Sequence, residues 1–271
     1  MTYDAYETSI EDGRPTILYR FTLGPTVWRY ACADEDLTIA GFVWKAMPLS
    51  DDGVKQTGES ASDTLNIEGS NRIGPAQVFR VAPPAQAIRA EKLYIHEGMI
   101  TPVVGYVGEV VSCDEPVPGS CRLACQSLAF TMRRQGVRLG WQKACPYALY
   151  DPLTCKVNKA DFDQAITIES VSGFDVSSSG FAAFADGYFA GGFIAWSDPV
   201  RGIQFVTIES HVGADVSTLS NSNMLYPGLV VTAYPGCART PAACKSFSNY
   251  PNYGGFEYLP GKSPFDGDPV F

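Results

Sequence analysis

YPGCARTPAAC, residues Tyr234–Cys244, places two cysteines seven positions apart around a tight turn and a helix start. Proline and glycine hold the second and third positions of a four-residue turn, which is typical of a type II turn. Thr240 followed by proline predicts a helix with a threonine N-cap and proline at its first position. Cys237 in the turn and Cys244 in the first helical turn are therefore expected to face one point, where the helix N-terminus favours thiolate.

A second cysteine pair lies in ACPYALYDPLTC, residues 144–155. Cys145 followed by proline predicts the opening of another short helix, and Asp151 followed by proline predicts its end, before Cys155. The two pairs, C-x9-C and C-x6-C, flank a β-patterned stretch of residues 156–236. If this insert begins and ends at one place, the four thiols converge.

Four converging thiolates suit zinc or an iron–sulfur cluster. Structural zinc sites usually use cysteines with only two to four residues between them, so the wide pairs favour a bulkier cluster slightly. Buried free cysteines with no ligand are the alternative. The spacing alone leaves all three interpretations open.

Most of the chain has the pattern of short β-strands separated by Gly, Pro, Asn and Asp. Strands are expected at 16–23, in a hairpin at 37–46 turning near Gly41, and at 63–69, 92–98, 102–113 and 121–127. After a connector at 128–143, two strands are expected around Asp198–Pro199 and another at 228–234. The prediction is a mainly β protein, with a β-barrel or sandwich domain over residues 1–140. A second domain over residues 141–271 carries the cysteines and the β-insert.

The remaining cysteines and the two histidines are expected to have structural roles. Cys121 and Cys125 alternate with Arg122 along one strand and are expected in the core, and Cys113 is expected across a hairpin from Cys121. The two histidines, His96 and His211, lie near neither cysteine pair, so a histidine ligand is poorly supported.

Composition narrows the function classes. Charged residues make up 18% of the 271 residues and the formal net charge is −9, whereas proteins that grip nucleic acid show a basic patch. The short RRQGVR run at residues 133–138 favours a solvated loop or a partner contact. No signal peptide, membrane-spanning apolar run or catalytic motif is evident, so we expect a non-enzymatic protein without a membrane anchor, made in the cytoplasm with reduced thiols.

The chain resembles the tail hub proteins of siphophages and gene transfer agents. The resemblance rests on DLTIAGFVWKAMPLS, CPYALYDPLTCKVNKADF, DGYFAGGF and YPGCARTPAACKSFSNYPNYGGFEYLPGKSPF, which follow in order almost end to end. It implies a homotrimeric ring of β-barrel hub domains at the tip of a tail tube. It also implies an iron–sulfur domain similar to that of minor tail protein L of lambda-like phages.

The resemblance further implies the ligands, the partners and the location. The ligands of one [4Fe–4S] cluster would be Cys145, Cys155, Cys237 and Cys244, with zinc as the alternative metal. A long insert separates the two pairs here, whereas they lie closer together in the lambda-like proteins. The partners would be a distal tail or tail tube protein, the tape measure protein, a baseplate or fibre protein, and phage DNA that passes through the lumen without specific binding. The mature protein would reside in the virion, after synthesis in the host cytoplasm.

Two alternatives belong to other function classes. An iron–sulfur redox enzyme would need a substrate pocket or electron partner, and no cofactor fingerprint is evident. A receptor-binding or carbohydrate-binding tail module would explain the aromatics Tyr250, Tyr253, Phe256 and Tyr258. Because these aromatics directly follow the second cysteine pair, a packing lid over the site is the simpler interpretation.

Overall fold

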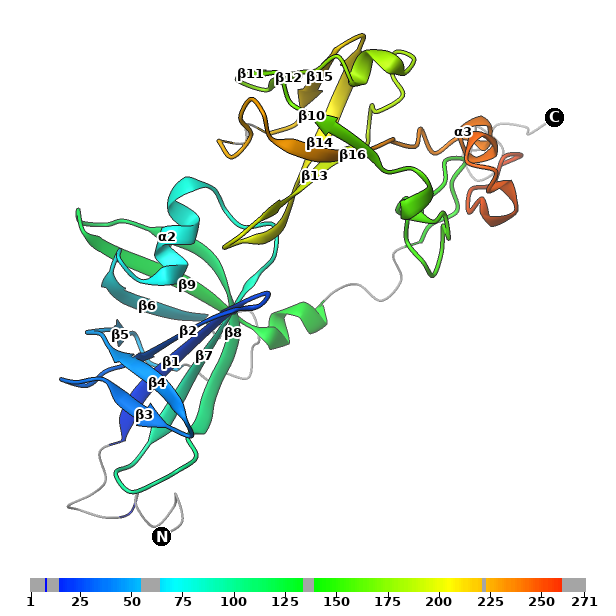
Figure 1. Cartoon of the computed structure of the whole chain (residues 1–271). Helices are drawn as coiled ribbons and strands as arrows, with labels where there is room; N and C mark the ends of the chain where they lie inside the picture. Colours follow the sequence, from blue (N-terminus) through cyan, green and yellow to red (C-terminus); the bar gives the residue numbers. More distant parts are fainter. Residues whose placement is uncertain (1–7, 9–14, 55–63, 134–138, 221–222, 260–271) are drawn as a thin grey trace. The chain divides into compact units, whose positions relative to one another are not determined.

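The structure is a computed structural model that describes residues 8, 15–54, 64–133, 139–220 and 223–259. It divides into two compact units (Figure 1). The first comprises Met1–Arg134 with Ser197–Gln204, and the second Gln135–Trp196 with Phe205–Phe271. The domain boundary at residue 140 and the independent folding of the two expected domains remain predictions.

The first unit is built on a nine-stranded sheet with the order β3-β4-β2-β1-β7-β8-β9-β6-β5. Its strands are β1 Thr16–Leu23, β2 Thr26–Ala31, β3 Leu37–Ile39, β4 Phe42–Ala46, β5 Ser50–Asp51, β6 Thr64–Ser70, β7 Ile88–Ile95, β8 Val103–Asp114 and β9 Ser120–Ser127. The helix α2, Gly74–Val81, adds Ala76 and Val78 to the core, and the 3-10 helix η1, Leu128–Arg133, follows β9. The hairpin of β3 and β4 confirms the turn expected near Gly41.

Side chains along β9 alternate between the core and the other face of the sheet. Cys121, Leu123 and Cys125 point into the core, whereas Arg122 between them is exposed, which confirms the core positions expected for both cysteines. The expected position of Cys113 opposite Cys121 is wrong, because Cys113 pairs with Leu123. A register shift between Val110 and Ser112 moves the pairing along the hairpin.

A buried polar network shows how strongly this sheet curves. Asp51 lies on β5, the last strand in the sheet order, yet its carboxylate accepts hydrogen bonds from Tyr19 on β1 and from Lys92 on β7. Those two strands occupy the middle of the sheet, five and four places from β5. The sheet therefore curls until its β5 end faces β1 and β7 across the core.

The second unit is built on a seven-stranded sheet with the order β10-β16-β13-β14-β15-β12-β11. Its strands are β10 Gln164–Thr167, β11 Ser170–Ser172, β12 Asp175–Ser177, β13 Phe193–Asp198, β14 Gly202–Val212, β15 Asp215–Thr218 and β16 Val230–Tyr234. The short 3-10 helix η2, Lys159–Asp161, precedes β10, and a second one, η3, Phe181–Ala183, lies between β12 and β13. The strands expected around Asp198–Pro199 and at 228–234 are confirmed as β13, β14 and β16.

This sheet has a core of its own. Phe181, Phe189, Ile194 and Ile208 are fully buried within it, together with other apolar side chains from residues 166–233. The insert expected at residues 156–236 is thus a packed β-structure, although its hairpin tip at Ser197–Gln204 belongs to the first unit. The mainly β fold class is confirmed in both units.

Two short helical elements complete the described chain, α3 at Pro241–Ser246 and η4 at Tyr250–Asn252. No helix within the described ranges is long and apolar enough to cross a membrane.

Candidate metal centre

The helix α3 forms as the sequence predicts. The Thr240 hydroxyl accepts a hydrogen bond from the amide N–H of Ala243 at 3.2 Å, and Pro241 is the first helical residue. The amide N–H of Cys244 donates to the carbonyl of Thr240 at 3.0 Å and so belongs to the first helical turn. The expected N-cap is confirmed and it fixes the position of Cys244.

The prediction of a helix between Cys145 and Asp151 is wrong, because this segment is irregular backbone with a bend and a turn at Leu149 and Tyr150. Few residues separate the two prolines, which is too short for a stable helix, and the residue before a proline is pushed away from helical geometry. Tyr150 adopts a left-handed conformation with φ 65°, which also ends any helix there. The carboxylate of Asp151 then accepts hydrogen bonds from the N–H of Leu153 and Thr154 and closes the next turn.

Tyr150 holds the cysteine segment against the sheet. Its ring makes edge contacts with Phe193 on β13 and Tyr234 on β16, and its hydroxyl donates to the carbonyl of Pro235 at 3.0 Å. Lys159 lies over the rings of both Phe193 and Tyr234, at 4.8 and 4.1 Å from their centroids. These contacts bring the segment that carries Cys145 and Cys155 beside the one that carries Cys237.

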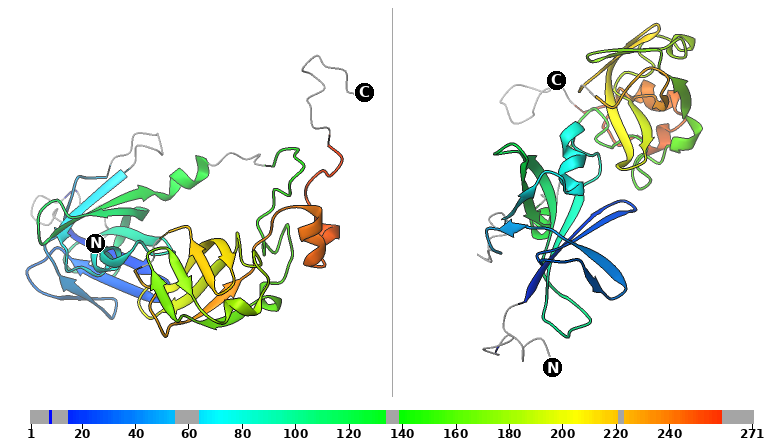
Figure 2. Two further views of the ribbon diagram at one scale, coloured as in Figure 1. Left: turned by 90° about the horizontal axis from the view of Figure 1, so that it is seen from above. Right: turned by 60° about the vertical axis from the view of Figure 1, so that its left-hand side comes forward.

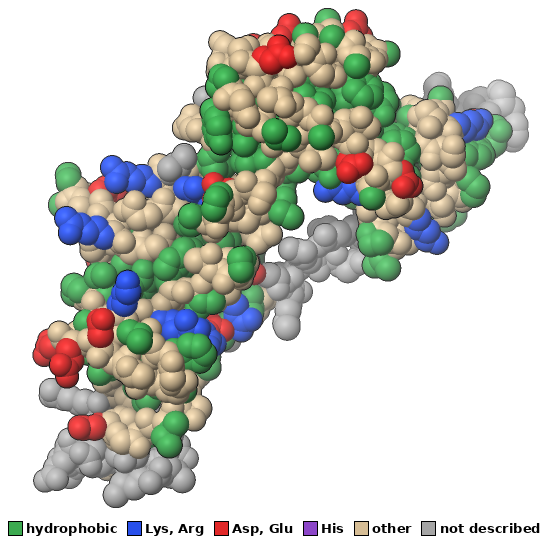
Figure 3. Space-filling view, viewed as in Figure 1, with side chains coloured by type: hydrophobic (Ala, Val, Ile, Leu, Met, Phe, Trp, Pro, Cys, Tyr) green, Lys and Arg blue, Asp and Glu red, His purple; other side chains and the backbone are tan. Residues whose placement is uncertain are grey.

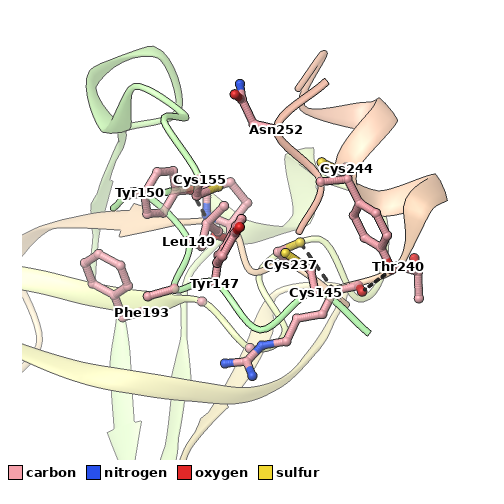
Figure 4. Close-up of a pocket in the computed structure, with 16 residues that line it drawn as sticks. Cys145, Tyr147, Leu149, Tyr150, Cys155, Phe193, Cys237, Thr240, Cys244 and Asn252 are labelled. Carbon is pink, nitrogen blue, oxygen red and sulfur yellow. Dashed lines mark hydrogen bonds between the residues drawn. The ribbon is translucent and has the colours of Figure 1, made fainter. Parts of the chain in front are cut away.

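Cys145, Cys155, Cys237 and Cys244 line one cavity of about 230 Å³ (Figure 4). The green segment with the first pair runs beside the orange segment around α3 in both Figure 1 and Figure 2. All four thiols are free; Cys244 is buried, and the other three are half-buried. The structure therefore brings the four predicted residues together.

Hydrogen bonds through two residues, Arg239 and Asn249, connect the cysteines of the first pair with those of the second pair. The carbonyl of Arg239 accepts from the N–H of Cys145 at 2.9 Å, and the N–H of Arg239 donates to the Cys237 sulfur at 3.4 Å. Arg239 has a φ of 58°, which turns its backbone toward both cysteines. Cys145 thus lies with Cys237, and Figure 4 shows their sulfur atoms close together.

Asn249 makes the second connection. Its side-chain amide donates to the carbonyl of Cys155 at 2.5 Å, and its own carbonyl accepts from the Cys244 thiol at 3.2 Å. Each cysteine of the first pair is consequently connected to one of the second pair.

The surroundings of Cys244 disfavour its thiolate form. Burial, followed by the negative charges that Cys237, Cys145 and Cys155 would carry, raises the pKa of the Cys244 thiol. The expectation that the helix terminus favours thiolate is therefore outweighed at Cys244 by burial and by its neighbours. Among the described residues that line the cavity, Arg239 is cationic and none is Asp or Glu.

The sulfur atoms do not stand in ligand geometry. Within the part of the chain that the structure describes, no group of three or more His, Cys, Asp or Glu is arranged to hold a metal ion. The donor set nevertheless suits a thiophilic metal, because four thiols surround one space and carboxylates do not compete. A water molecule occupies about 30 Å³, so the cavity has room for a group larger than a single ion.

Neither histidine joins the cavity. His211 is buried against the rings of Phe181 and Phe189, and its Nε2 lies 3.3 Å from the carbonyl of Phe181. His96 is buried near the end of β7 in the first unit.

The aromatic tail covers the cavity only in part. Tyr253 lines it, and its hydroxyl donates to the carbonyl of Lys143 at 2.6 Å. Tyr250, Phe256 and Tyr258 instead line a neighbouring groove with Trp141, whose ring stacks on Phe256 at 4.7 Å. Of the four aromatic side chains that were expected to cover the cysteines, Tyr253 therefore lines the cavity and the other three do not. The tail from residue 260 and most of the RRQGVR run lie outside the described residues.

Sequence reasoning missed the residues that hold the cysteines. Arg239 acts through its backbone, which no side-chain pattern shows. A Cβ on Gly236 would lie 2.0 Å from the carbonyl oxygen of Ala190, so glycine is required there by a chain contact distant in sequence. Asn249 stands in an Asn- and Tyr-rich stretch, where an amide in a turn is the ordinary interpretation.

Comparison with known proteins finds both a family profile and a solved structure that are similar to this chain. A family profile described as "Phage conserved hypothetical protein BR0599" matches residues 187–263, a range that includes Cys237 and Cys244. No curated protein matches the chain. A solved chain from "Virion of native gene transfer agent (GTA) particle" superposes with a TM-score of 0.81 at 14% identity, covering 100% of this chain and 99% of that one. The chain therefore shares its fold along its whole length with a chain of a gene transfer agent virion.

Proposed function

We propose that this chain is a structural protein of a phage or gene transfer agent virion, and specifically the hub at the distal end of the tail tube. The full-length likeness to a chain of a gene transfer agent virion, with a TM-score of 0.81, carries the proposal. The phage family profile over residues 187–263 supports it independently from the sequence.

In this proposal the chain assembles as a homotrimer between the tail tube and the baseplate or fibres. It contacts a distal tail or tail tube protein and the tape measure protein, and phage DNA passes through its lumen. A net charge of −9 favours a conduit through which DNA moves without sticking. On the face shown in Figure 3, basic side chains are interspersed with acidic, apolar and neutral ones.

Particle imaging tests the location. An epitope tag on the chain, followed by gold labelling of purified particles, should place the label at the tail tip. Negative-stain images of the isolated protein should show rings, with a solution mass of three chains. Label on the capsid, or on the far end of a fibre, would exclude the hub role.

We further propose that Cys145, Cys155, Cys237 and Cys244 ligate one [4Fe–4S] cluster. The four thiols around one cavity of about 230 Å³ support a thiolate-bound metal. The wide spacing of the cysteines within each pair favours a cluster over a single zinc ion. When bound, the cluster would join the segments at the two ends of the β-insert through four Fe–S bonds. The sulfur atoms must move closer than they stand here to reach ligand geometry.

Metal content distinguishes the cluster from zinc. Anaerobically purified protein should contain about four iron and four sulfide per chain and absorb broadly near the blue end of the visible range. Cys237→Ser should lose most of that iron. Cys121→Ser, which alters a core thiol of the first unit, is the control and should keep it. Stoichiometric zinc without iron would replace the cluster, and full iron in Cys237→Ser would exclude this ligand set.

A further inference from the structure

Asn249 is a polar side chain buried between two of the proposed ligands. Only 8% of its surface is exposed, and it lies shortly after α3, beyond the C-cap residue Phe247. Its backbone N–H donates to the carbonyl of Cys244 at 3.0 Å, while its carbonyl accepts from the Cys244 thiol at 3.2 Å. The backbone of Asn249 thus holds Cys244 at both its main chain and its sulfur.

The side chain of Asn249 contacts Cys155, which lies 94 residues away in sequence. Its Nδ2 donates to the Cys155 carbonyl at 2.5 Å and lies 3.6 Å from the Cys155 sulfur. The orientation of the amide is fixed from the other side, because Oδ1 accepts from Nδ2 of Asn252 at 2.6 Å. The amide N–H groups therefore face Cys155, as an N–H···S hydrogen bond requires.

We propose that Asn249 is a positioning residue of the cysteine centre, which holds Cys155 against Cys244 and donates a hydrogen bond to the Cys155 sulfur. The inference rests on the proposed metal centre. Groups that hydrogen-bond to metal ligands orient them and tune the metal, and their loss typically weakens metal binding 10–100-fold. An N–H···S bond also withdraws electron density from the sulfur, so it should leave a spectroscopic signature.

Two variants separate the hydrogen bond from charge and size. Asn249→Asp keeps the shape but replaces the N–H donor with an oxygen, whereas Asn249→Leu removes the donor without adding charge. Asn223→Asp, at an exposed position of the same unit, is the control. Far-ultraviolet circular dichroism should confirm that all three full-length chains keep their β-structure.

Co²⁺ is the probe, because its sulfur-to-metal charge-transfer bands report on thiolate ligands whichever metal is native. Both Asn249 variants should bind Co²⁺ 10–100-fold more weakly than the wild type, and their charge-transfer bands should move to longer wavelength. A residue that merely fills space would not move the bands in the same direction in both variants. Affinity within twofold of the wild type, or unmoved bands, would overturn the proposal.

Hydrogen exchange distinguishes failure of the inference from failure of the metal centre. If the wild type binds neither iron nor Co²⁺, the metal assignment fails on its own. The positioning role is then measured in the metal-free chains, where Asn249→Leu should lose protection at residues 153–157 and 244–249. Unchanged exchange at both segments would overturn the role of Asn249 as well.

Discussion

Asp51 shows how one residue can hold a sheet in its curve. Its side chain is 5% exposed and accepts hydrogen bonds from the Tyr19 hydroxyl and from Lys92, whose Nζ lies 2.6 Å away. Burial alone would raise the pKa of Asp51, but the hydrogen bonds from Lys92, Tyr19 and the N–H of Gly53 outweigh burial and lower the pKa below its usual value. The ionised form is therefore the one that the fold stabilises.

The stability of the first unit should fall in acid through this residue. Because the pKa of Asp51 is lowered in the folded state, its contribution is fully present above the unfolded value of about 4 and is lost as pH falls through the folded value. Asp51→Asn leaves Lys92 buried without its partner and should destabilise the unit by about 3–5 kcal/mol at pH 7. Urea unfolding from pH 7 down to pH 3 should show a smaller acid dependence in the variant. An equal dependence in both proteins would contradict the network.

Cys121 and Cys125 should behave as inert core thiols. Burial raises the pKa of Cys121 to about 11, with a further contribution from Cys113, and burial raises that of Cys125 to about 12. Thiolate is the reactive form, so neither thiol should react with iodoacetamide at pH 8 until the first unit unfolds. Peptide mass spectrometry with and without urea measures this directly. Labelling of either cysteine in the native protein would contradict its place in the core.

At the scale of elements, strands were predictable where alternation and turn residues agreed. The range expected for β1 matches residue for residue, and the hairpin at Gly41 has a turn signal in its sequence. The helix α2 was missed because a Gly–Pro pair at its start favours a loop, while its apolar residues gain from packing into the core. The helix wrongly predicted after Cys145 is the converse case. Its sequence contains a helix start signal, but the tertiary contacts of Tyr150 stabilise a non-helical conformation there.

Two neighbouring turns of the second unit require glycine for their close approach. A Cβ at Gly236 would meet the carbonyl of Ala190 at 2.0 Å, so Gly236→Ala forces the backbone before Cys237 to shift. Overpacking of this kind typically costs about 1–3 kcal/mol, and the shift should also lower metal occupancy. Gly140→Ala is the matched control, because a Cβ there meets nothing within 4 Å. Thermal unfolding and iron content should separate the two variants, and equal values would contradict the close packing.

At the scale of the whole molecule, the identities of the four cysteines could be predicted but their arrangement could not. The spacing places Cys145 with Cys155 and Cys237 with Cys244 in sequence. In the structure, Arg239 instead connects Cys145 with Cys237, and Asn249 connects Cys155 with Cys244. This difference in pairing depends on where the end of the β-insert lies relative to its start. That position is set by long-range contacts, which local sequence patterns do not contain.

The seven-stranded sheet limits what the metal can stabilise. Closing a loop of residues 156–236 costs roughly 4 kcal/mol in chain entropy, and a metal that joins its ends would offset part of that cost. The insert nevertheless has its own buried core, which includes Phe181, Phe189 and Ile208. In contrast, the segments that carry the cysteines consist of irregular backbone and turns beside the short helices α3 and η4.

Removal of the metal should therefore loosen the cysteine segments and leave both sheets protected. After anaerobic chelation, hydrogen exchange should accelerate by at least tenfold at residues 145–156 and 236–253, because the ligand bonds that fix these turns are lost. Exchange along β14 and β16 should change little, since the core around Ile208 and Val231 does not involve the cysteines. Cys121→Ser, measured in parallel, should respond to chelation like the wild type. Loss of protection throughout the seven-stranded sheet would mean that the insert folds only with metal, and unchanged exchange at the cysteine segments would mean that no metal holds them.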